Sequence, residues 1–277
     1  MIFNEKKEIY GVDIKGFYVK ITKKNPGIHC ITNIVSANDC ANILLAMGAS
    51  PVMAQHVLDA GEISGGCDAL VCNFGATGAY DAMYEAAKSA ALLKHPIVAD
   101  PVGVGASAYR RSCFLDFISK FKVSCIRGNI SEIRALHEKR PTARGVDVSE
   151  YELKNNSGDE SVLFRNAEWI REFSLKANCI VVCSGETDIV TDGKNTVFVT
   201  DGCSLMSRVS ATGCMASAVT AAFLSVENSF ISAAASISFM GRCGEYALKH
   251  LERGTSGIGS GSFRVGLIDA AGLIFNE

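Results

Sequence analysis

Residues Thr212, Gly213 and Cys214 form a short turn sequence ahead of a run of small residues that is typical of a helix. The first backbone N–H groups of a helix have no partner inside it and lie at the positive end of the helix dipole. A helix start of this kind binds anions such as phosphate. The segment has no lysine and does not match G-x-x-x-x-G-K-[ST], so it predicts an anion site other than a P-loop.

The role of Cys214 is open on sequence grounds. A helix start can lower the pKa of a thiol, which would make Cys214 a proton acceptor, or a nucleophile if a histidine stood nearby. In a chain with eleven cysteines it could equally be a buried structural residue.

Polar residues also follow several short β-rich runs. Asp100 follows Pro96–Ala99, and Arg127 follows Val123–Ile126. Two further runs end in the same way, at Asn73 and at Ser184. Because the carboxyl ends of parallel strands share one edge of a sheet, we expect these residues to converge on one cleft.

The chemistry of these residues suits a phosphorylated ligand. Asp100 and Glu132 could hold Mg²⁺ through water, because this ion prefers oxygen ligands and keeps part of its hydration shell. For Glu132 the alternative, interaction with the dipole of the helix it begins, is equally good. The guanidinium of Arg127 matches phosphate with two hydrogen bonds. The turn at residues 184–188 could touch a nucleotide or be an ordinary turn.

Helical patterns such as Tyr80–Lys94 alternate with the strands, which predicts βαβ units and a mostly parallel sheet covered on both faces. An antiparallel hairpin is expected at residues 188–200, around the turn 192–195. Two long helices are expected at 213–226 and 229–253.

A helix is also expected from Ser36 to Met47, with Ser36 and Asp39 as a capping pair and Gly48 as its stop. The following segment, Ala49–Met53, reads as an apolar loop fixed by proline that could wall a small apolar ligand.

The composition limits the classes of function. The 277 residues, 48% of them hydrophobic, are expected to form one domain, with a loop-rich excursion at about 139–162. A net charge of −2 and a pI near 6.2 argue against a nucleic-acid partner. The sequence has no apolar run long enough for a membrane helix, and its charged start does not resemble a signal peptide, so we expect a cytoplasmic protein. The odd number of cysteines and the lack of a C-x-x-C pair argue against a disulfide framework or a zinc site.

Taken together, these residues resemble the hydroxyethylthiazole kinase family of thiamine salvage. The resemblance runs from about residue 27 almost to the end of the chain. It rests on seven strings in a shared order: His29-Cys-Ile-Thr-Asn33, Asn38-Asp-Cys-Ala-Asn42, Gly48-Ala-Ser-Pro-Val-Met53, Asp100-Pro-Val-Gly-Val-Gly-Ala106, Ile126-Arg-Gly-Asn-Ile-Ser-Glu132, Thr212-Gly-Cys-Met215 and Gly261-Ser-Phe-Arg-Val265.

The resemblance implies a three-layer α/β/α ribokinase-like fold that transfers the γ-phosphate of ATP, with Mg²⁺, to the hydroxyl of 4-methyl-5-(2-hydroxyethyl)thiazole. It implies a homotrimer with the active site near the subunit interface. Cys214 stands where related sugar kinases carry a catalytic aspartate. The implied site residues are Thr212, Gly213 and Cys214 for catalysis, Met53, Ala211 and Asn33 for the thiazole, Arg127, Ser184 and Asn129 for ATP, and Asp100 and Glu132 for the metal.

The chain departs from the family pattern at several points. Ala211 stands where the usual T-G-T-G-C string has its first glycine, and Ser184 stands where threonine is common. Residues 73–77 differ from the usual N-I-G-T-L, and residues 1–26 and 154–160 have no clear match. Three other readings remain open: a hydrolase with a Cys214 nucleophile, a non-catalytic protein that binds thiazole or nucleotide, and a hydroxymethylpyrimidine-type kinase, which the Met53 segment disfavours.

Overall fold

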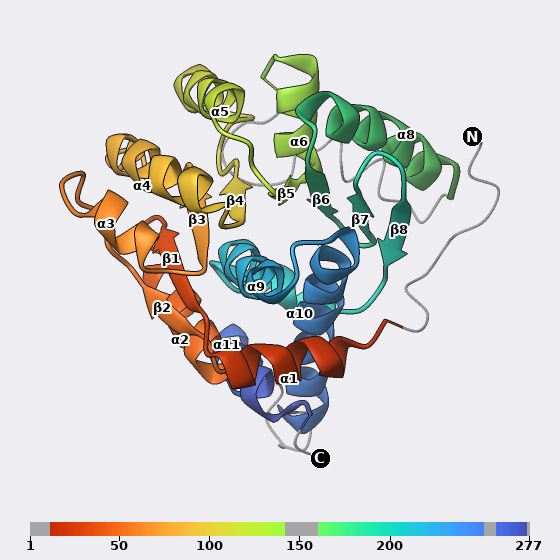
Figure 1. Ribbon diagram of the computed structural model, residues 1–277. Helices are drawn as coiled ribbons and strands as arrows, with labels where there is room; N and C mark the ends of the chain where they lie inside the picture. Colours follow the sequence, from red (N-terminus) through yellow and green to blue (C-terminus); the bar gives the residue numbers. More distant parts are fainter. Residues whose placement is uncertain (1–11, 142–159, 252–258, 276–277) are drawn as a thin grey trace.

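The computed structural model describes residues 12–141, 160–251 and 259–275, which build one eight-stranded sheet between two layers of helices (Figure 1). The strands are ordered β2-β1-β3-β4-β5-β6-β7-β8 across the sheet. The first six are parallel, and the last two run antiparallel to their neighbours. Their bounds are β1 Gly27–Ile31, β2 Ser50–Val52, β3 Ala69–Asn73, β4 Ile97–Asp100, β5 Cys125–Asn129, β6 Ile180–Ser184, β7 Asp188–Thr191 and β8 Thr196–Val199.

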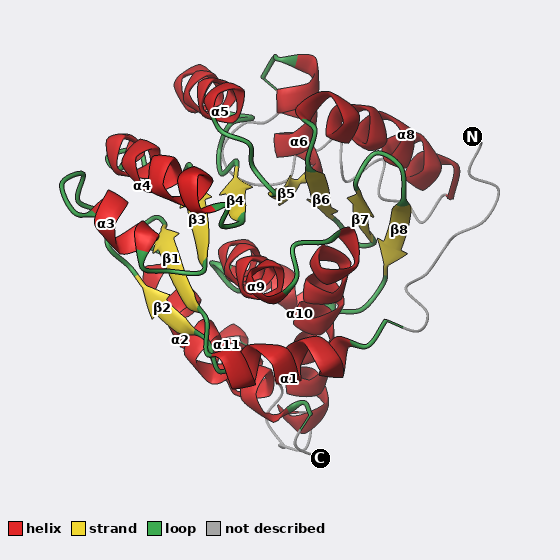
Figure 2. Ribbon diagram, viewed as in Figure 1, coloured by secondary structure: helices red, strands yellow, loops and turns green. Residues whose placement is uncertain are grey.

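The helices divide between the two faces of the sheet, as Figure 2 shows. One layer holds α1 Ile14–Lys24, α2 Ala37–Ala46, α9 Thr212–Val226, α10 Phe230–Leu251 and α11 Ser260–Leu273. The other holds α3 Ala60–Gly65, α4 Tyr80–Leu93, α5 Ala108–Lys120, α6 Ile130–Glu138 and α8 Glu160–Ala177. A short 3₁₀ helix, η1, covers Ser204–Arg208. The expected α/β/α architecture is confirmed.

Strand β3 illustrates why these segments form a buried sheet. Its residues are all buried, and they alternate between the two cores: Ala69 and Val71 face one, Leu70 and Cys72 the other. A strand buried on both faces therefore reads as a continuous apolar run, the pattern from which it was predicted. The predicted hairpin at residues 188–200 and the two long helices are also confirmed.

Helix α9 lies against the middle of the sheet, packed on β3 and β4. Every residue from Met215 to Leu224 is buried, so the helix has no polar face. Its small side chains allow this close approach, and its hydroxyl groups are satisfied locally. Thr220 Oγ1, for example, donates to the Ala216 carbonyl (2.8 Å) and lies 2.9 Å from Ser236 Oγ. This packing fixes where α9 begins, and hence the position of the Thr212–Cys214 turn.

Part of the N-terminal segment left without a role by the sequence belongs to the core. Residues Ile14–Lys24 form α1. The ring of Phe17 lies 5.8 Å from that of Phe223, and the ring of Tyr18 lies 5.9 Å from that of Phe239. Aromatic contacts of this kind contribute beyond simple burial, so α1 helps to hold α9 and α10 in place.

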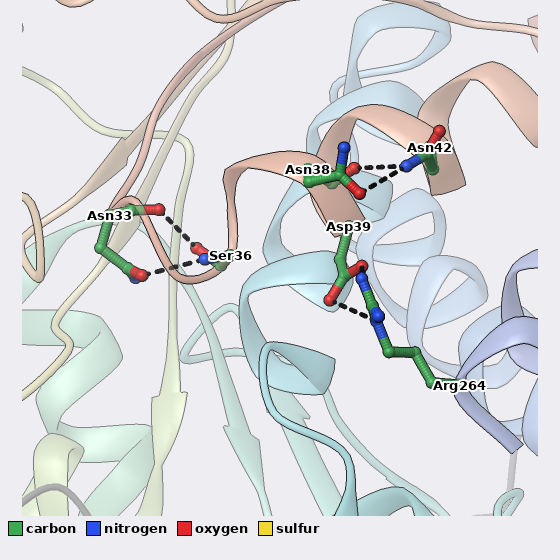
Figure 3. A network of polar contacts seen from close by, with 6 residues as sticks. All are labelled: Asn33, Ser36, Asn38, Asp39, Asn42 and Arg264. Carbon is green, nitrogen blue, oxygen red and sulfur yellow. Dashed lines mark hydrogen bonds and ion pairs between the residues drawn. The ribbon is translucent and has the colours of Figure 1, made fainter. Parts of the chain in front are cut away.

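The predicted capping pair of α2 is wrong. Helix α2 ends before Gly48 as expected, but the side chain of Ser36 makes no capping hydrogen bond. Asp39 instead accepts two hydrogen bonds from Arg264 Nε, at 2.8 and 3.0 Å, and one from its Nη2 (Figure 3). The charged arginine outcompetes a local cap because a charge-assisted, bidentate pair is the stronger interaction. This ion pair joins α2 to α11.

The segment Ala49–Met53 is not purely a loop. Its central residues form the edge strand β2, which pairs in parallel with β1. Pro51 is compatible with that place because an edge strand has one side on which no N–H group is needed. Of the loop-rich excursion expected at 139–162, residues 142–159 lie outside the described part of the chain. No helix within that part is both long and apolar enough to cross a membrane.

We predict that Gly241→Ala destabilises the fold. A Cβ atom at Gly241, in α10, would lie 2.4 Å from the backbone oxygen of Asp201. That clash outweighs the helix propensity gained from alanine, so the free energy of unfolding should fall by about 1–3 kcal/mol. Denaturant titration measures it. The control is Gly261→Ala in α11, where an added Cβ meets nothing within 4 Å. An unchanged or raised stability of Gly241→Ala would contradict the prediction.

Candidate active site

The predicted polar strand ends do converge at one edge of the sheet, where α9 begins. Asn33 follows β1, Asn73 and Asp100 end β3 and β4, and Arg127 lies in the middle of β5, two residues before its end. Strand pairing sets Asn73 opposite Asp100 and Asn129 opposite Ser184. These side chains surround the Thr212–Cys214 turn.

Two asparagine side chains hold the thiol of Cys214. Asn73 Nδ2 donates to its Sγ at 3.0 Å, and Asn33 Nδ2 donates at 3.7 Å. Asn33 is itself held because its Oδ1 accepts the backbone N–H of Ser36 at 3.1 Å (Figure 3). The amide of Asn73 is oriented by the N–H of Gly75, which donates to Oδ1 at 2.8 Å. Both amides therefore present N–H groups to sulfur.

The possibility that the helix start lowers the pKa of Cys214 is wrong. Burial and the nearby charge of Asp100 raise the pKa to about 11, although hydrogen bonds from Ser36 and Asn73 and the charge of Arg127 act in the opposite direction. Desolvation penalises a thiolate more than the helix start and its donors favour it. Cys214 is a neutral thiol at neutral pH.

Asp100 is a buried carboxylate with one strongly engaged oxygen. Its Oδ2 accepts from Ser217 Oγ at 2.7 Å and from Asn73 Nδ2 at 3.4 Å. Burial raises the pKa of Asp100, while Arg127 and the hydroxyl of Ser217 lower it. Because Ser217 lies one helical turn after Gly213, this hydrogen bond ties the start of α9 to the end of β4.

Arg127 lies directly across the start of α9. A Cβ atom at Gly213 would lie 2.6 Å from its Nη1, so a larger residue here would displace the guanidinium from this position. The Nε atom is buried and has no hydrogen-bond partner among the described residues. Glu132 and Asp188 lie close enough to Arg127 that its charge offsets part of the rise in pKa that burial causes in both carboxyl groups. A partly exposed, incompletely bonded guanidinium beside unpaired helix amides is suited to binding an anion.

Glu132 lies in the first turn of α6, as the alternative of an interaction with the helix dipole requires, and its carboxylate also caps the helix. Its Oε2 accepts the N–H of Asn129 and its Oε1 that of Gly103, both at 3.0 Å. Asn129 Oδ1 in turn accepts the N–H of Glu132 at 2.9 Å, which completes a capping box at the start of α6. Burial and the charge of Asp100 raise the pKa of Glu132 to about 7.

The donor set fits Mg²⁺ only with help from water and a ligand. Asp100 and Glu132 offer carboxylate oxygens whose second lone pairs can accept water, and each carboxylate raises the free energy of ionising the other. A divalent cation would relieve that repulsion. The described residues contain no cluster of three or more His, Cys, Asp or Glu that could hold a metal alone. Mg²⁺ is commonly bound through one or two carboxylates plus water and phosphate.

The remaining predicted residues lie around this centre. Thr212 uses its hydroxyl to bond the Val209 carbonyl at 2.9 Å, and Ser184 Oγ donates to the Gly128 carbonyl at 3.3 Å. Ala211 precedes α9 with φ 70° and ψ −1°, in the left-handed region. Met53 follows β2 and packs partly buried against the core. Gln55, two residues further on, bonds the Thr32 carbonyl through its Nε2 and so ties the segment after Met53 to the end of β1.

Three residues of the site have contacts that the sequence did not assign to them. Asn73 and Ser217 connect Cys214 and α9 to Asp100, and Asp188 caps the turn after β6 by accepting the N–H of Gly185 at 2.9 Å. Burial raises the pKa of Asp188 to about 6. The position of Asn73 at a strand end was a usable signal, whereas Ser217 lies inside an apolar helix and gave none.

Comparison with known proteins agrees with this geometry. The sequence profile described as the hydroxyethylthiazole kinase family matches residues 18–277. The chain belongs to this family. The match begins nine residues before the start suggested by the sequence strings, inside α1.

Relatives of the family cover nearly the whole chain. Hydroxyethylthiazole kinase of Clostridium beijerinckii is 39% identical over 91% of this chain and 88% of its own length. The solved structure of the hydroxyethylthiazole kinase protein of Pyrococcus horikoshii OT3 has a TM-score of 0.80 at 32% identity, covering 94% of this chain and 92% of that one. A ribokinase-like superfamily protein of Enterococcus faecalis shares the fold alone, with a TM-score of 0.60 at 9% identity over 96% and 90% of the two chains.

We predict that Ala211→Gly stabilises the protein. An L-residue in the left-handed region is strained and glycine is not, so the free energy of unfolding should rise by about 0.5–1 kcal/mol. The matched control is Ala91→Gly on the exposed surface of α4, which should lower stability by about 0.5–1 kcal/mol. Equal signs for the two variants in denaturant titration would refute the assignment of strain to Ala211.

We predict slow alkylation of Cys214 at neutral pH. With a pKa of about 11, the thiolate fraction at pH 7 is about one in ten thousand, and it rises roughly tenfold per pH unit up to the pKa. Iodoacetamide labelling, quantified at Cys214 by peptide mass spectrometry, should follow this slope, whereas labelling of free glutathione measured in parallel should level off above the ordinary thiol pKa of about 8.5. Fast labelling at pH 7 would show a lowered pKa and restore the nucleophile hypothesis.

Proposed function

We propose that this chain transfers the γ-phosphate of ATP to the primary hydroxyl of 4-methyl-5-(2-hydroxyethyl)thiazole, in thiamine salvage. The observation that carries the proposal is the placement of Arg127 across Gly213, beside the start of α9 and next to Cys214. Membership of the hydroxyethylthiazole kinase family supports the same substrates. Phosphoryl transfer depends mainly on alignment and on neutralising charge, and this group of residues is equipped for both.

Charge neutralisation in this proposal comes from three directions. Arg127 contributes its guanidinium from β5. The amides of Thr212–Cys214 precede the first backbone hydrogen bond of α9, from Met215 N to the Ala211 carbonyl, and are therefore directed toward the same point. Mg²⁺, when bound with ATP, would supply further positive charge to the phosphates. Asp100 and Glu132 would hold the water ligands of that ion, and Asn129 and Ser184 would flank the nucleotide.

The role proposed for Cys214 is to position the acceptor hydroxyl. With a pKa of about 11, Cys214 is almost entirely protonated at neutral pH. Its thiolate is therefore too scarce to act as an efficient general base. If the hydroxyl loses its proton late, as in a loose transition state, a strong base is not required. Asn33 and Asn73 keep the thiol directed toward the start of α9.

The thiazole would lie between the Met53 segment and Ala211. Met53 offers a flexible apolar side chain, and Ala211 offers backbone close to the reacting centre. The extra methyl group of Ala211 relative to glycine would narrow this space. A hydroxymethylpyrimidine-type substrate, which the Met53 segment disfavours, is the second candidate within the kinase class.

The proposed assembly is a cytoplasmic homotrimer of single-domain chains, with the site near a subunit interface. Large apolar side chains are exposed at this edge of the sheet: Ile34 is 93% and Leu58 is 87% exposed. They follow β1 and β2, next to the segment that carries Met53. Apolar side chains gathered beside a site are typical of surfaces that another protein covers.

The decisive experiment measures ADP release with Mg²⁺-ATP and the hydroxyethylthiazole. We expect thiazole-dependent ADP, and we expect Arg127→Ala to lower kcat/KM for ATP roughly 10- to 100-fold, because a charge-assisted contact to phosphate is lost. Arg165→Ala, on the exposed surface of α8, is the matched control and should leave the rate unchanged.

Parallel arms separate the rival functions. Binding of thiazole or nucleotide without ADP release would favour a binding protein, and preference for the hydroxymethylpyrimidine alcohol would favour the second kinase. ATP-independent turnover that iodoacetamide abolishes would favour the hydrolase. Cys214→Asp tests the thiol, since related sugar kinases carry aspartate at that place. No thiazole-dependent ADP from well-folded protein would refute the proposed function.

A further inference from the structure

The segment after β2, which carries Met53, is held to β1 by two side chains. His29 Nε2 lies 2.9 Å from the Ala54 carbonyl, and Gln55 Nε2 lies 2.5 Å from the Thr32 carbonyl. Strand β2 has only three residues, and its register with β1 ends at the pair His29–Val52. Beyond that pair, these two hydrogen bonds continue the attachment that backbone pairing no longer provides.

The tautomer of His29 follows from its surroundings. A carbonyl oxygen only accepts hydrogen bonds, so Nε2 carries the proton that bonds Ala54. The ring is completely buried, and Nδ1 has no hydrogen-bond partner among the described residues. Protonation would place a second N–H group in this unpartnered position, and burial accordingly lowers the pKa of His29. The imidazole is therefore a neutral, constant donor to Ala54.

This arrangement assigns a specific contribution to His29. A buried acceptor without a partner is unfavourable, and an apolar side chain of similar size would avoid that penalty. An apolar side chain such as leucine, however, could not donate the hydrogen bond to the Ala54 carbonyl. The effect of the imidazole is therefore local, on the backbone next to Met53.

The same segment is connected to the centre of the site. Gln55 bonds the carbonyl of Thr32, and the next residue, Asn33, donates to the sulfur of Cys214 at 3.7 Å. The backbone of Met53–Gln55 and the end of β1 thus form one bonded wall that reaches Cys214. His29 fixes the buried side of this wall, and Gln55 fixes its exposed side.

We infer that His29 is a positioning residue for the acceptor alcohol: it fixes the backbone beside Met53 against β1 without touching the substrate. The inference rests on the proposed function, because it assigns Met53 to the thiazole side of the site. His29 is 0% exposed, so it acts through Ala54. Its loss should weaken binding of the alcohol and leave ATP, held at β5 and β6, unaffected.

The test compares His29→Leu with His29→Gln. Glutamine can place an N–H donor at about the reach of Nε2, whereas leucine keeps the volume without the donor. We expect His29→Leu to raise KM for the thiazole alcohol about fivefold, in line with the loss of one hydrogen bond, with kcat and KM for ATP unchanged. His29→Gln should restore most of the affinity. Calorimetric binding of the alcohol alone should change in parallel.

Two further variants keep the test decisive. Gln55→Ala alters an exposed side chain, so it is expected to fold even if His29→Leu does not, and it should also raise KM for the alcohol alone. His95→Leu is the matched control, because the Nδ1 atom of His95 is likewise buried and has no partner among the described residues. His95 precedes β4 and so lies at the amino ends of the strands, away from the site. It should leave both KM values unchanged.

The outcomes separate this inference from the proposed function. If His29→Leu and Gln55→Ala keep the wild-type KM for the alcohol, or if they change kcat and both KM values together as a general loss of structure would, the inference is wrong. If the wild-type protein makes no ADP with the thiazole, the proposed function fails first. An active wild type with unaltered variants refutes the positioning role alone.

Discussion

The contact of Arg127 with Gly213 is the interaction on which the rest of the site depends. A side chain at Gly213, the second position of α9, would displace the guanidinium, and the contact also requires α9 to begin within reach of β5. The hydrogen bond from Ser217 to Asp100 secures the second condition one turn further along the helix. The buried, small-residue body of α9 exists to bring its first turn to this place, since a bulkier helix could not lie against the middle of the sheet.

Charge is concentrated around that contact. The carboxyl groups of Asp100, Glu132 and Asp188 all have raised pKa values because burial costs more than the charge of Arg127 returns. The single guanidinium of Arg127 does not fully compensate the negative charges that these carboxyl groups would carry when ionised. Such a site gains most from a ligand that brings both a cation and an anion, as a metal-bound phosphate does.

Local patterns in the sequence were sufficient for most of the sheet, although the edge strand β2 was expected to be a loop. Continuous apolar runs located four parallel strands, and the shared direction of those strands brought Asp100, Arg127 and Ser184 together without further information. The failures involve distance or burial. Asp39 pairs with a residue 225 positions away, which no capping pattern contains. The raised pKa of Cys214 depends on desolvation by packed neighbours, whereas the sequence shows only the helix start, which acts in the opposite direction.

The architecture divides the work of the site between two parts of the sheet. Strands β4–β6 carry Asp100, Arg127 and Ser184, whose charges and polar groups together suit a metal-bound phosphate and do not depend on the shape of the acceptor. In the proposed function, strands β1 and β2 carry the wall around Met53 that would face the thiazole, where shape decides. Cys214 is where the two parts meet, because Asn33 reaches it from β1 and Asn73 links it to Asp100 on β4. Changes in the β1–β2 wall can therefore alter which alcohol is accepted, while the chemistry of phosphate at β4–β6 stays the same.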